Sequence, residues 1–539
     1  MRPTTLILLV SLWIASVANL ALWRALEHLP ELDNWRGLAF GIAFAIMIVA
    51  AHVALFSLLA WRRTLKPALA IFLLAAAVGG YFMLSYGVVI DRTMMVNVLL
   101  TDTREARELL SPRMLATVLL LGVLPVALFW RVPLQWASVG RQWRRNVLLL
   151  IGSSATLVGA AGLSFQDLSS TMRNHTQLRY LINPLNSFYA LAVVGRQPIQ
   201  RNGAHVLPLG EDATLSAQAP GGKPPLVILV VGETARADHF GINGYARDTT
   251  PELARENVVS LRNVWSCGTN TAASLPCMFS NLGRDAFEQR TANTEGLADV
   301  LRHAGLAVLW LDNQAGGCKG VCDRVPKVDY KQFQAPDLCR DDECDDEVML
   351  RGLDERIARL PAERRARGVV VFMHQMGSHG PAYFKRSPPA FKKFLPECTS
   401  SALQQCDQQQ VVNAYDNTIV HTDHVLATAI DWLKSREAQW APALVYLSDH
   451  GESLGENNLY LHGLPYAIAP DAQKHVPWIF WLSPQFAQQS HVALSCLARR
   501  RDDRLSHDNY FHTALGLLGV QTGAYVPARD IAASCRDPS

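Results

Sequence analysis

The chain has 539 residues, a formal net charge of +3 at pH 7 and 49% hydrophobic residues. This apolar content excludes a disordered chain. The first 166 residues carry 14 Lys and Arg against seven Asp and Glu, so the basic excess lies there and the remainder is net acidic. Because nucleic-acid binding needs basic residues clustered on a folded face, we expect no nucleic-acid partner.

Five apolar runs without charged residues occupy the N-terminal part of the chain. The runs are 3–23, 37–61, 67–90, 114–130 and 146–166. Each is close to the roughly 20 residues that a helix needs to cross about 30 Å of hydrocarbon. Five in succession favour a membrane domain over buried core helices. The first run could instead be a cleavable signal peptide, but the four spans after it favour an uncleaved helix.

The loops between these runs predict the orientation of the chain. The loops at 62–66 and 131–145 contain Arg or Lys and no acid, which is typical of cytoplasmic loops. The loops at 24–36 and 91–113 mix both charges, which indicates the external side. With five spans and an internal N-terminus, everything after about residue 166 is expected outside the cytoplasm.

The ten cysteines all follow residue 266, in the predicted external part. Disulfides form in such an oxidising compartment, and a thiolate zinc site is the alternative. Sequence proximity predicts four pairs and elimination leaves the fifth. The pairs are Cys267–Cys277, Cys318–Cys322, Cys339–Cys344, Cys398–Cys406 and Cys496–Cys535.

The segment after the fifth run connects the two parts of the chain. Residues 165–194 place apolar residues at helical spacing, which fits either an amphipathic helix on the membrane surface or an ordinary packed helix. Residues 201–225 are rich in Gly, Pro and Ala, as in a linker. We therefore expect a transmembrane domain at 1–166, a bridging segment and linker at 167–223, and an external catalytic domain at 224–539.

The external domain has the pattern of an α/β fold with a mostly parallel sheet, because apolar runs alternate with helix-like segments. The runs are 226–231, 306–311, 368–373, 444–447 and 478–481. Asp312 and His374 directly follow two of these runs, and Glu233 and the pair Asp449 and His450 follow two others after one intervening residue. Ligands of open α/β sheets bind beyond the carboxyl ends of the strands, so these side chains are expected along one rim.

Three of the side chains at this rim form a candidate metal site. They are Glu233, Asp449 and His450. Two carboxylates and an imidazole suit zinc and leave a position for a reactive ligand. Further histidines could bind a second metal, hold a phosphate or transfer a proton, although loop histidines without a function are the alternative. These histidines are His374, His379 and His462.

The expected nucleophile lies between Cys267 and Cys277. A hydroxyl is a weak nucleophile at neutral pH, and a metal ion or a helix N-terminus stabilises its alkoxide. Thr269, Thr271 and Ser274 all qualify, and spacing does not choose among them.

Four motifs resemble those of the lipid A phosphoethanolamine transferases. They are GETARADHF at 232–240, the element at 267–277, HQMGSHGPAY at 374–383 and SDHGESLGE at 448–456. The resemblance covers nearly the whole chain. It implies five spans in the bacterial inner membrane, followed by a periplasmic domain of alkaline-phosphatase-like fold.

The resemblance also implies roles for single residues. Thr271 would be the nucleophile and would complete a zinc site with three residues, which are Glu233, Asp449 and His450. Four further residues would surround the phosphoethanolamine group, a second zinc or a proton-transfer path. They are Lys319, His374, His379 and His462, with His374 preferred as the proton donor. Asn97, Thr101 and Glu105 in the external loop would face a lipid head group, and a solvated helix face with paired charges is the alternative reading of that loop.

The implied reaction moves phosphoethanolamine from phosphatidylethanolamine to a phosphate of lipid A through a phosphoethanolamine-threonine intermediate. It implies one or two zinc ions, a monomeric enzyme, and resistance to polymyxin. Core sugars and periplasmic glucans are alternative acceptors. A sulfatase activity is not supported, because sulfatases have Pro two residues and Arg four residues after the modified Cys or Ser, and neither follows Thr271. Lipoteichoic-acid phosphoglycerol transferases share the five spans and the threonine nucleophile, but the many cysteines and the motif at 374–383 favour phosphoethanolamine transfer. A non-catalytic lipid sensor is disfavoured, because it would be expected to have lost at least one of the four site residues, and all four are present.

Overall fold

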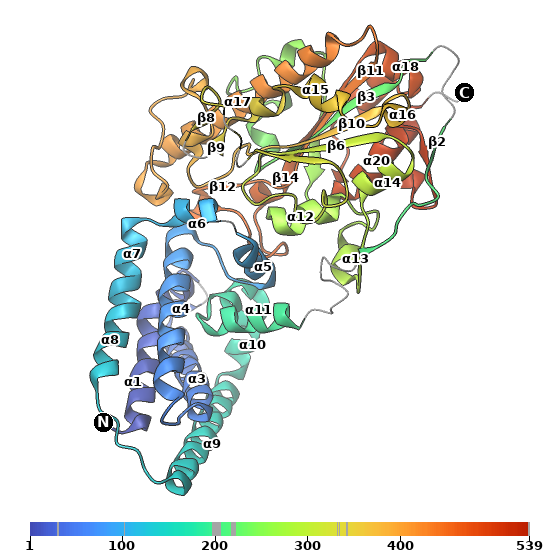
Figure 1. Cartoon of the computed structure of the whole chain (residues 1–539). Coiled ribbons are helices and arrows are strands. Elements are labelled where there is room, and N and C mark those ends of the chain that lie inside the picture. Colours follow the sequence, from blue (N-terminus) through green and yellow to red (C-terminus); the bar gives the residue numbers. More distant parts are fainter. Residues whose placement is uncertain are drawn as a thin grey trace. The chain divides into compact units, whose positions relative to one another are not determined.

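The structure is a computed structural model that describes residues 1–29, 32–101, 103–196, 206–216, 222–330, 333, 335–340 and 343–536. The side chains of residues 103–105 also lie outside the described residues. The chain forms two compact units (Figure 1). One comprises Met1–Met95 and Leu110–Arg196, and the other comprises Val96–Leu109 and Gln197–Ser539.

The first unit contains the predicted membrane spans. The described residues hold five helical stretches long and apolar enough to cross a membrane, which are Pro3–Glu27, Trp35–Leu58, Leu65–Tyr86, Pro112–Arg131 and Val139–Leu163. They are built from α1 (Pro3–Ser16), α2 (Leu20–Glu27), α3 (Trp35–Leu58), α4 (Leu65–Tyr86), α7 (Pro112–Val118), α8 (Leu124–Arg131) and α9 (Val139–Leu163). The predicted five-helix membrane domain is thus confirmed.

The fifth span begins earlier than its apolar run indicates. Because α9 starts at Val139, Arg141, Arg144 and Arg145 lie in its first two turns and not in a loop. Long basic side chains are compatible with such a position, since their charged ends reach the aqueous interface while the stem stays on the helix.

The segment after α9 packs into the first unit. It consists of α10 (Phe165–Asn174), a 3₁₀ helix (Thr176–Leu181) and α11 (Leu185–Gly195). Leu185 and Phe188 pack against the apolar core of the spans. Asn183 is fully buried, and its side chain donates to the carbonyl oxygens of Ala18 (2.9 Å) and Ala76 (2.6 Å). Residues 183–188 therefore match the packed-helix alternative, whereas Phe165, Tyr189 and Leu191 of the same segment are exposed.

The second unit is built on an eight-stranded mixed sheet (Figure 1). In spatial order its strands are β15 (Leu505–Ser506), β4 (Val259–Trp265), β14 (His475–Leu482), β11 (Ala441–Ser448), β3 (Pro225–Gly232), β10 (Val369–His374), β6 (Ala307–Asp312) and β7 (Lys327–Asp329). The five predicted runs are all strands of this sheet. β14 runs antiparallel to both of its neighbours, and the strands from β11 to β7 are parallel.

Helices lie on both faces of the sheet. The α-helices of the second unit after β4 are α12 (Thr271–Met278), α13 (Arg284–Gln289), α14 (Leu297–His303), α15 (Leu353–Ala358), α16 (Ala362–Arg365), α17 (Gln408–Lys434), α18 (Pro484–Gln489), α19 (Leu494–Arg499) and α20 (Tyr510–Leu517). Val227, Leu229 and Val231 of β3 belong to the core shared with α14 and α20. The residues between them, Ile228 and Val230, are equally buried and point to the other face. Burial on both faces explains the continuous apolar runs.

Part of the expected linker pairs with strands of the second unit. β1 (Val206–Leu207) pairs with β5 (Asn293–Thr294), and β2 (Thr214–Leu215) pairs with β16 (Val520–Gln521). The stretch 206–216 is therefore part of the second unit and not a free linker. Its two-residue strands are too short for a period-2 pattern to reveal them.

Five disulfides join all ten cysteines, in the four pairs that sequence proximity predicts and in the fifth pair that elimination leaves. The first encloses the predicted nucleophile segment between Cys267 and Cys277. The third joins the hairpin of β8 (Cys339–Arg340) and β9 (Glu343–Cys344). Four of the five span ten residues or fewer, so they constrain local loops.

The turn after β11 lies tightly against residues 472 and 473. The backbone N–H of Gly451 donates to the Gln473 carbonyl (3.1 Å), and that of Glu452 donates to the Ala472 carbonyl (2.8 Å). A Cβ at Gly451 would lie 2.1 Å from the Ala472 carbonyl oxygen. Only glycine therefore fits this position without a shift of the backbone.

We expect Gly451→Ala to destabilise the second unit by about 1–3 kcal/mol, because the clash is with backbone and not with a flexible side chain. Thermal unfolding of the detergent-solubilised chain should show a Tm lowered by a few degrees. Gly523→Ala is the matched control, since its nearest contact is a side-chain oxygen at 3.4 Å. Equal Tm values for both variants would contradict the packing argument.

Candidate functional site

The candidate metal ligands follow two adjacent parallel strands. Gly232 of β3 is paired with Ser448 of β11, so Glu233 and Asp449 continue these strands side by side. His450 follows directly. Glu233, Asp449 and His450 are fully buried, and one ligand atom from each lies within 4.8 Å of the others. The register of the two strands thus creates the predicted cluster.

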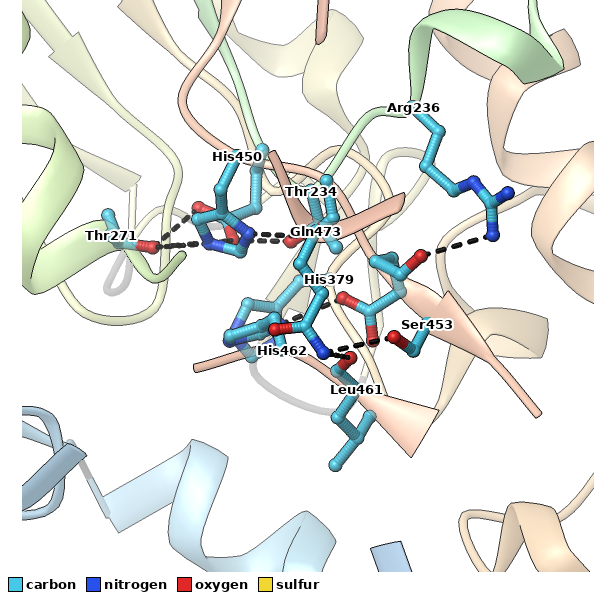
Figure 2. Close-up of polar contacts among 12 residues, drawn as sticks. Thr234, Arg236, Thr271, His379, His450, Ser453, Leu461, His462 and Gln473 are labelled. Atoms are coloured by element: carbon cyan, nitrogen blue, oxygen red, sulfur yellow. Dashed lines mark hydrogen bonds and ion pairs between the residues drawn. The ribbon is translucent and has the colours of Figure 1, made fainter. Parts of the chain in front are cut away.

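Thr271 completes this cluster from the start of α12 (Figure 2). Its Oγ1 lies 3.1 Å from Glu233 Oε2 and 3.4 Å from His450 Nε2. His450 Nε2 in turn lies 3.4 Å from Glu233 Oε1 and 3.5 Å from Asp449 Oδ2. Four side chains from three separate segments therefore point toward one another.

The structure distinguishes Thr271 from the other candidate hydroxyls. Thr269 Oγ1 donates to the Leu464 carbonyl at 2.7 Å. Ser274 Oγ donates to the Asp449 carbonyl in a short hydrogen bond. Both hydroxyls thus bind backbone, whereas that of Thr271 faces the carboxylate and imidazole of the cluster.

The segment that carries Thr271 is fixed from two sides. The side chain of Asn270 caps α12 by accepting the N–H of Ala273 at 3.0 Å. His507 accepts the N–H of Cys267 at 3.1 Å, and its other ring nitrogen lies 2.9 Å from the Ser448 carbonyl. Burial lowers the pKa of His507 to about 3, so the ring is neutral. A positive helix end beside Thr271 favours its alkoxide.

The charges of the cluster are unbalanced without a metal ion. Burial opposes ionisation of Glu233, but the hydrogen bond and charge of His450 outweigh it and hold its pKa well below the usual value. Burial and the charge of Glu233 raise the pKa of Asp449 to about 6. Against the cost of burial, the charges of Asp449 and Glu233 raise the pKa of His450 to about 10. One imidazolium thus faces two carboxyl groups.

This donor set fits a divalent cation. Asp449 Oδ2 is buried and has no hydrogen-bond partner, although buried carboxylate oxygens are normally paired. Two carboxylates, one imidazole and a hydroxyl are ligands that zinc accepts. A bound cation would supply the missing partner of Asp449 and replace the proton on His450.

A second group of side chains surrounds His462 (Figure 2). Glu452 is fully buried, and its carboxylate accepts a hydrogen bond from the Tyr383 hydroxyl (2.6 Å) and lies 2.8 Å from His462 Nδ1. The ring of His462 lies 4.3 Å from that of His450 and 6.1 Å from that of His379, between ring centres. Glu452 therefore orients His462 so that its Nε2 remains available to the site.

The hairpin that carries His462 is held by Gln473. β12 (Ser453–Leu454) and β13 (Tyr460–Leu461) form this hairpin. The amide nitrogen of Gln473 donates to Ser453 Oγ (2.9 Å) and to the Leu461 carbonyl (3.1 Å) (Figure 2). Leu461 has φ +64°, which is unfavourable for a residue with a Cβ and is stabilised by these bonds.

His374 is the last residue of β10, and His379 lies on the loop that follows it. His374 is fully buried, with Nδ1 3.2 Å from Asp312 Oδ1 and with Nε2 unpaired. Burial lowers its pKa, but the hydrogen bond and charge of Asp312 outweigh burial and raise it. Asp346 holds the loop, since it accepts the N–H groups of Met376 (2.8 Å) and Gly377 (2.9 Å).

The remaining predicted residues lie in and around the segment 96–109 of the second unit. Lys319 Nζ lies 3.4 Å from the Leu100 carbonyl. The Thr101 hydroxyl donates to the carbonyl of Asn97 at 2.8 Å, so it caps its own helix. The side chain of Glu105 lies outside the described residues.

Sequence reasoning gave no role to several residues that contact the site. They are Gln314, Tyr383, Arg386, Glu452 and Gln473. The amide of Gln314, two residues after the predicted Asp312, donates to Glu233 Oε2 at 3.2 Å. Its position just beyond the end of a strand could have identified it. Tyr383 and Glu452 lie within two of the four motifs, whereas Arg386 and Gln473 act by contacts between distant segments, which one sequence does not reveal.

Comparison with known proteins gives first the class and then the family. A family model described as Sulfatase matches residues 225–520, and one described as Phosphoethanolamine transferase EptA/EptB matches residues 48–199. Phosphoethanolamine transferase EptA of Salmonella typhimurium is 40% identical, with 98% of this chain and 96% of that protein covered. Phosphatidylethanolamine transferase Mcr-1 of Escherichia coli is 37% identical, with 96% and 95% covered.

A solved structure shares the whole architecture. The integral membrane protein lipooligosaccharide phosphoethanolamine transferase A from Neisseria meningitidis matches with a TM-score of 0.92 at 34% identity, covering 99% of both chains. The second unit therefore has the fold of the alkaline phosphatase and sulfatase superfamily. The chain belongs to the phosphoethanolamine transferase family. It is an integral protein of the bacterial inner membrane, with its sheet domain in the periplasm.

We expect Glu452→Gln to lower phosphoethanolamine transfer roughly tenfold to a hundredfold, because the amide keeps the shape but removes the charge beside His462. Transfer by purified protein in lipid vesicles measures the effect. Glu456→Gln is the matched control. Glu456 lies in the same loop and pairs with Arg236 at 2.5 Å. If Glu452→Gln retained full turnover, the negative charge of Glu452 would have no role beside His462.

Proposed function

We propose that the protein transfers phosphoethanolamine from phosphatidylethanolamine to a phosphate of lipid A through a phosphoethanolamine-threonine intermediate on Thr271. The observation that carries the proposal is the hydroxyl of Thr271, 3.1 Å from Glu233 and 3.4 Å from His450 in a buried anionic cluster. Similarity to transferases of phosphoethanolamine supports the transferred group.

Zinc is the cofactor that we propose for this cluster. Glu233, Thr271, Asp449 and His450 would hold it. When bound, it would stabilise the alkoxide of Thr271 and offset the charge of the phosphoryl oxygens. A second zinc ion beside His379 and His462 would further offset the charge of the phosphoryl oxygens.

In the first half-reaction, Thr271 Oγ1 forms a bond to the phosphorus of phosphatidylethanolamine, and the bond to the diacylglycerol oxygen breaks. Glu233 lies within reach of the hydroxyl proton. We assign protonation of the leaving oxygen to His374, because Asp312 favours its imidazolium form. Lys319 would contact the phosphoryl oxygens as a fixed positive charge.

In the second half-reaction, a phosphate oxygen of lipid A attacks the phosphorus and the bond to Thr271 breaks. Glu452 keeps His462 Nε2 directed at the site, where it would contact the transferred group in both steps. Both substrates are membrane lipids, which explains why the catalytic domain is tethered by five spans. Asn97, Thr101 and Glu105 are proposed to contact the lipid head group.

We expect Thr271→Ala to abolish phosphoethanolamine addition to lipid A, because the Thr271 hydroxyl lies within 3.4 Å of both Glu233 and His450. Mass spectrometry of lipid A from cells that produce the protein tests this. Thr271→Ser is the control and should retain measurable transfer. Unmodified lipid A together with phosphoethanolamine on core sugars would instead show that the acceptor is the core oligosaccharide.

Masking a phosphate with an amine should also weaken binding of cationic peptides to the cell surface. We therefore expect the wild-type protein, but not Thr271→Ala, to raise the polymyxin concentration that inhibits growth. Susceptibility assays measure this. Equal protection by both forms would contradict the proposed link between transfer and resistance.

We expect Asp449→Asn to lower zinc occupancy at least roughly tenfold, because the amide places an N–H group where a cation needs an oxygen. Elemental analysis of the purified protein measures the occupancy. Glu456→Gln should leave it unchanged, because Glu456 pairs with Arg236 outside the ligand set. Stoichiometric zinc in Asp449→Asn would show that this cluster is not the metal site.

A further inference from the structure

Arg386 is a buried residue to which neither the motifs nor the proposed chemistry gives a role. Its side chain is 3% exposed, and each of its nitrogens contacts a different segment. Nε donates to the backbone carbonyl of His379 at 3.0 Å. Nη1 pairs with Glu343 in a short contact, and Nη2 donates to Glu108 Oε2 at 2.6 Å. One guanidinium therefore joins three segments.

Glu108 belongs to the segment 96–109, which connects two membrane spans in the sequence. The segment comprises the end of α5 (Arg92–Leu100) and α6 (Thr103–Leu109). The Glu108 side chain is 6% exposed, and its second oxygen lies 3.3 Å from Lys385 Nζ. The carboxylate thus contacts two cations of the sheet domain.

Apolar burial does little to hold this segment. Val98, Leu99 and Leu100 are 53%, 57% and 49% exposed. Polar contacts among the described residues join it to the rest of its unit at two places, namely Glu108 and the Leu100 carbonyl near Lys319. A charge-assisted pair with low exposure is the stronger of such contacts, so Glu108 makes the strongest described contact between the segment and the rest of its unit.

We propose that Glu108 is a positioning residue. Its buried ion pair with Arg386 fixes the segment 96–109 relative to the His379 backbone, and so places this segment for binding of the donor lipid. The consequence for substrate binding rests on the proposed function. The physical coupling itself rests only on the contacts of Arg386.

Glu343 provides a matched control for Glu108. Both carboxylates pair with the same guanidinium, but Glu343 lies on β9 in the disulfide-linked hairpin and not on the segment 96–109. Glu108→Gln and Glu343→Gln each remove one charge beside Arg386. A loss of stability around Arg386 would appear in both variants. Greater mobility of the segment 96–109 would appear only in Glu108→Gln.

The test uses the full chain in nanodiscs that contain phosphatidylethanolamine. Hydrogen–deuterium exchange should increase in peptides covering residues 96–109 in Glu108→Gln and not in Glu343→Gln. The KM for the donor lipid should rise roughly tenfold to a hundredfold in Glu108→Gln, because small displacements of binding groups have large kinetic effects. Zinc content should stay unchanged in both.

Exchange in Glu108→Gln equal to that of the wild type, or an equal increase in both variants, would overturn the proposal. A KM equal to that of the wild type would overturn its second part. The two hypotheses fail separately. If the wild-type protein transferred no phosphoethanolamine, the proposed function would be wrong, while the exchange measurement would still decide whether Glu108 fixes the segment.

Discussion

The arrangement of the site depends on two carboxyl groups that are buried side by side. Glu233 and Asp449 follow paired strands and are both fully removed from water, with one imidazole to offset them. Burial of like charges is unfavourable by several kcal/mol unless a cation or hydrogen bonds compensate. The unpaired oxygen of Asp449 shows where compensation is missing. A divalent cation at that place would satisfy the carboxylates and activate the Thr271 hydroxyl together.

The rest of the domain holds the groups around this pair. The parallel pairing of β11, β3, β10 and β6 brings their carboxyl ends to one rim. Around the rim, side chains such as Glu452, Gln473 and His507 each fix one functional loop by bonding its backbone or its histidine. Most of these groups are buried, so their positions are set before a substrate binds, which is the requirement for electrostatic catalysis.

The sequence predicted the features that repeat or lie close together in the chain. Apolar length predicted the five spans, and continuous apolar runs predicted the strands buried on both faces. β4 was missed because Ser260, Arg262 and Asn263 interrupt its apolar residues, so it is not a continuous apolar run. The motifs predicted Glu233, Asp449 and His450, but spacing left Thr269, Thr271 and Ser274 equivalent. The structure separates them by hydrogen bonds that join residues about 200 positions apart. Arg386 was missed for the same reason.

The central claim is that a cation bound by the buried carboxylates turns Thr271 into a nucleophile. Peptide mass spectrometry on purified protein exposed to phosphatidylethanolamine tests it most directly. The account predicts a phosphoethanolamine adduct on Thr271, lost when the protein is first stripped of metal with a chelator and restored by added zinc. An adduct that forms equally well without metal, or on another residue, would contradict the account.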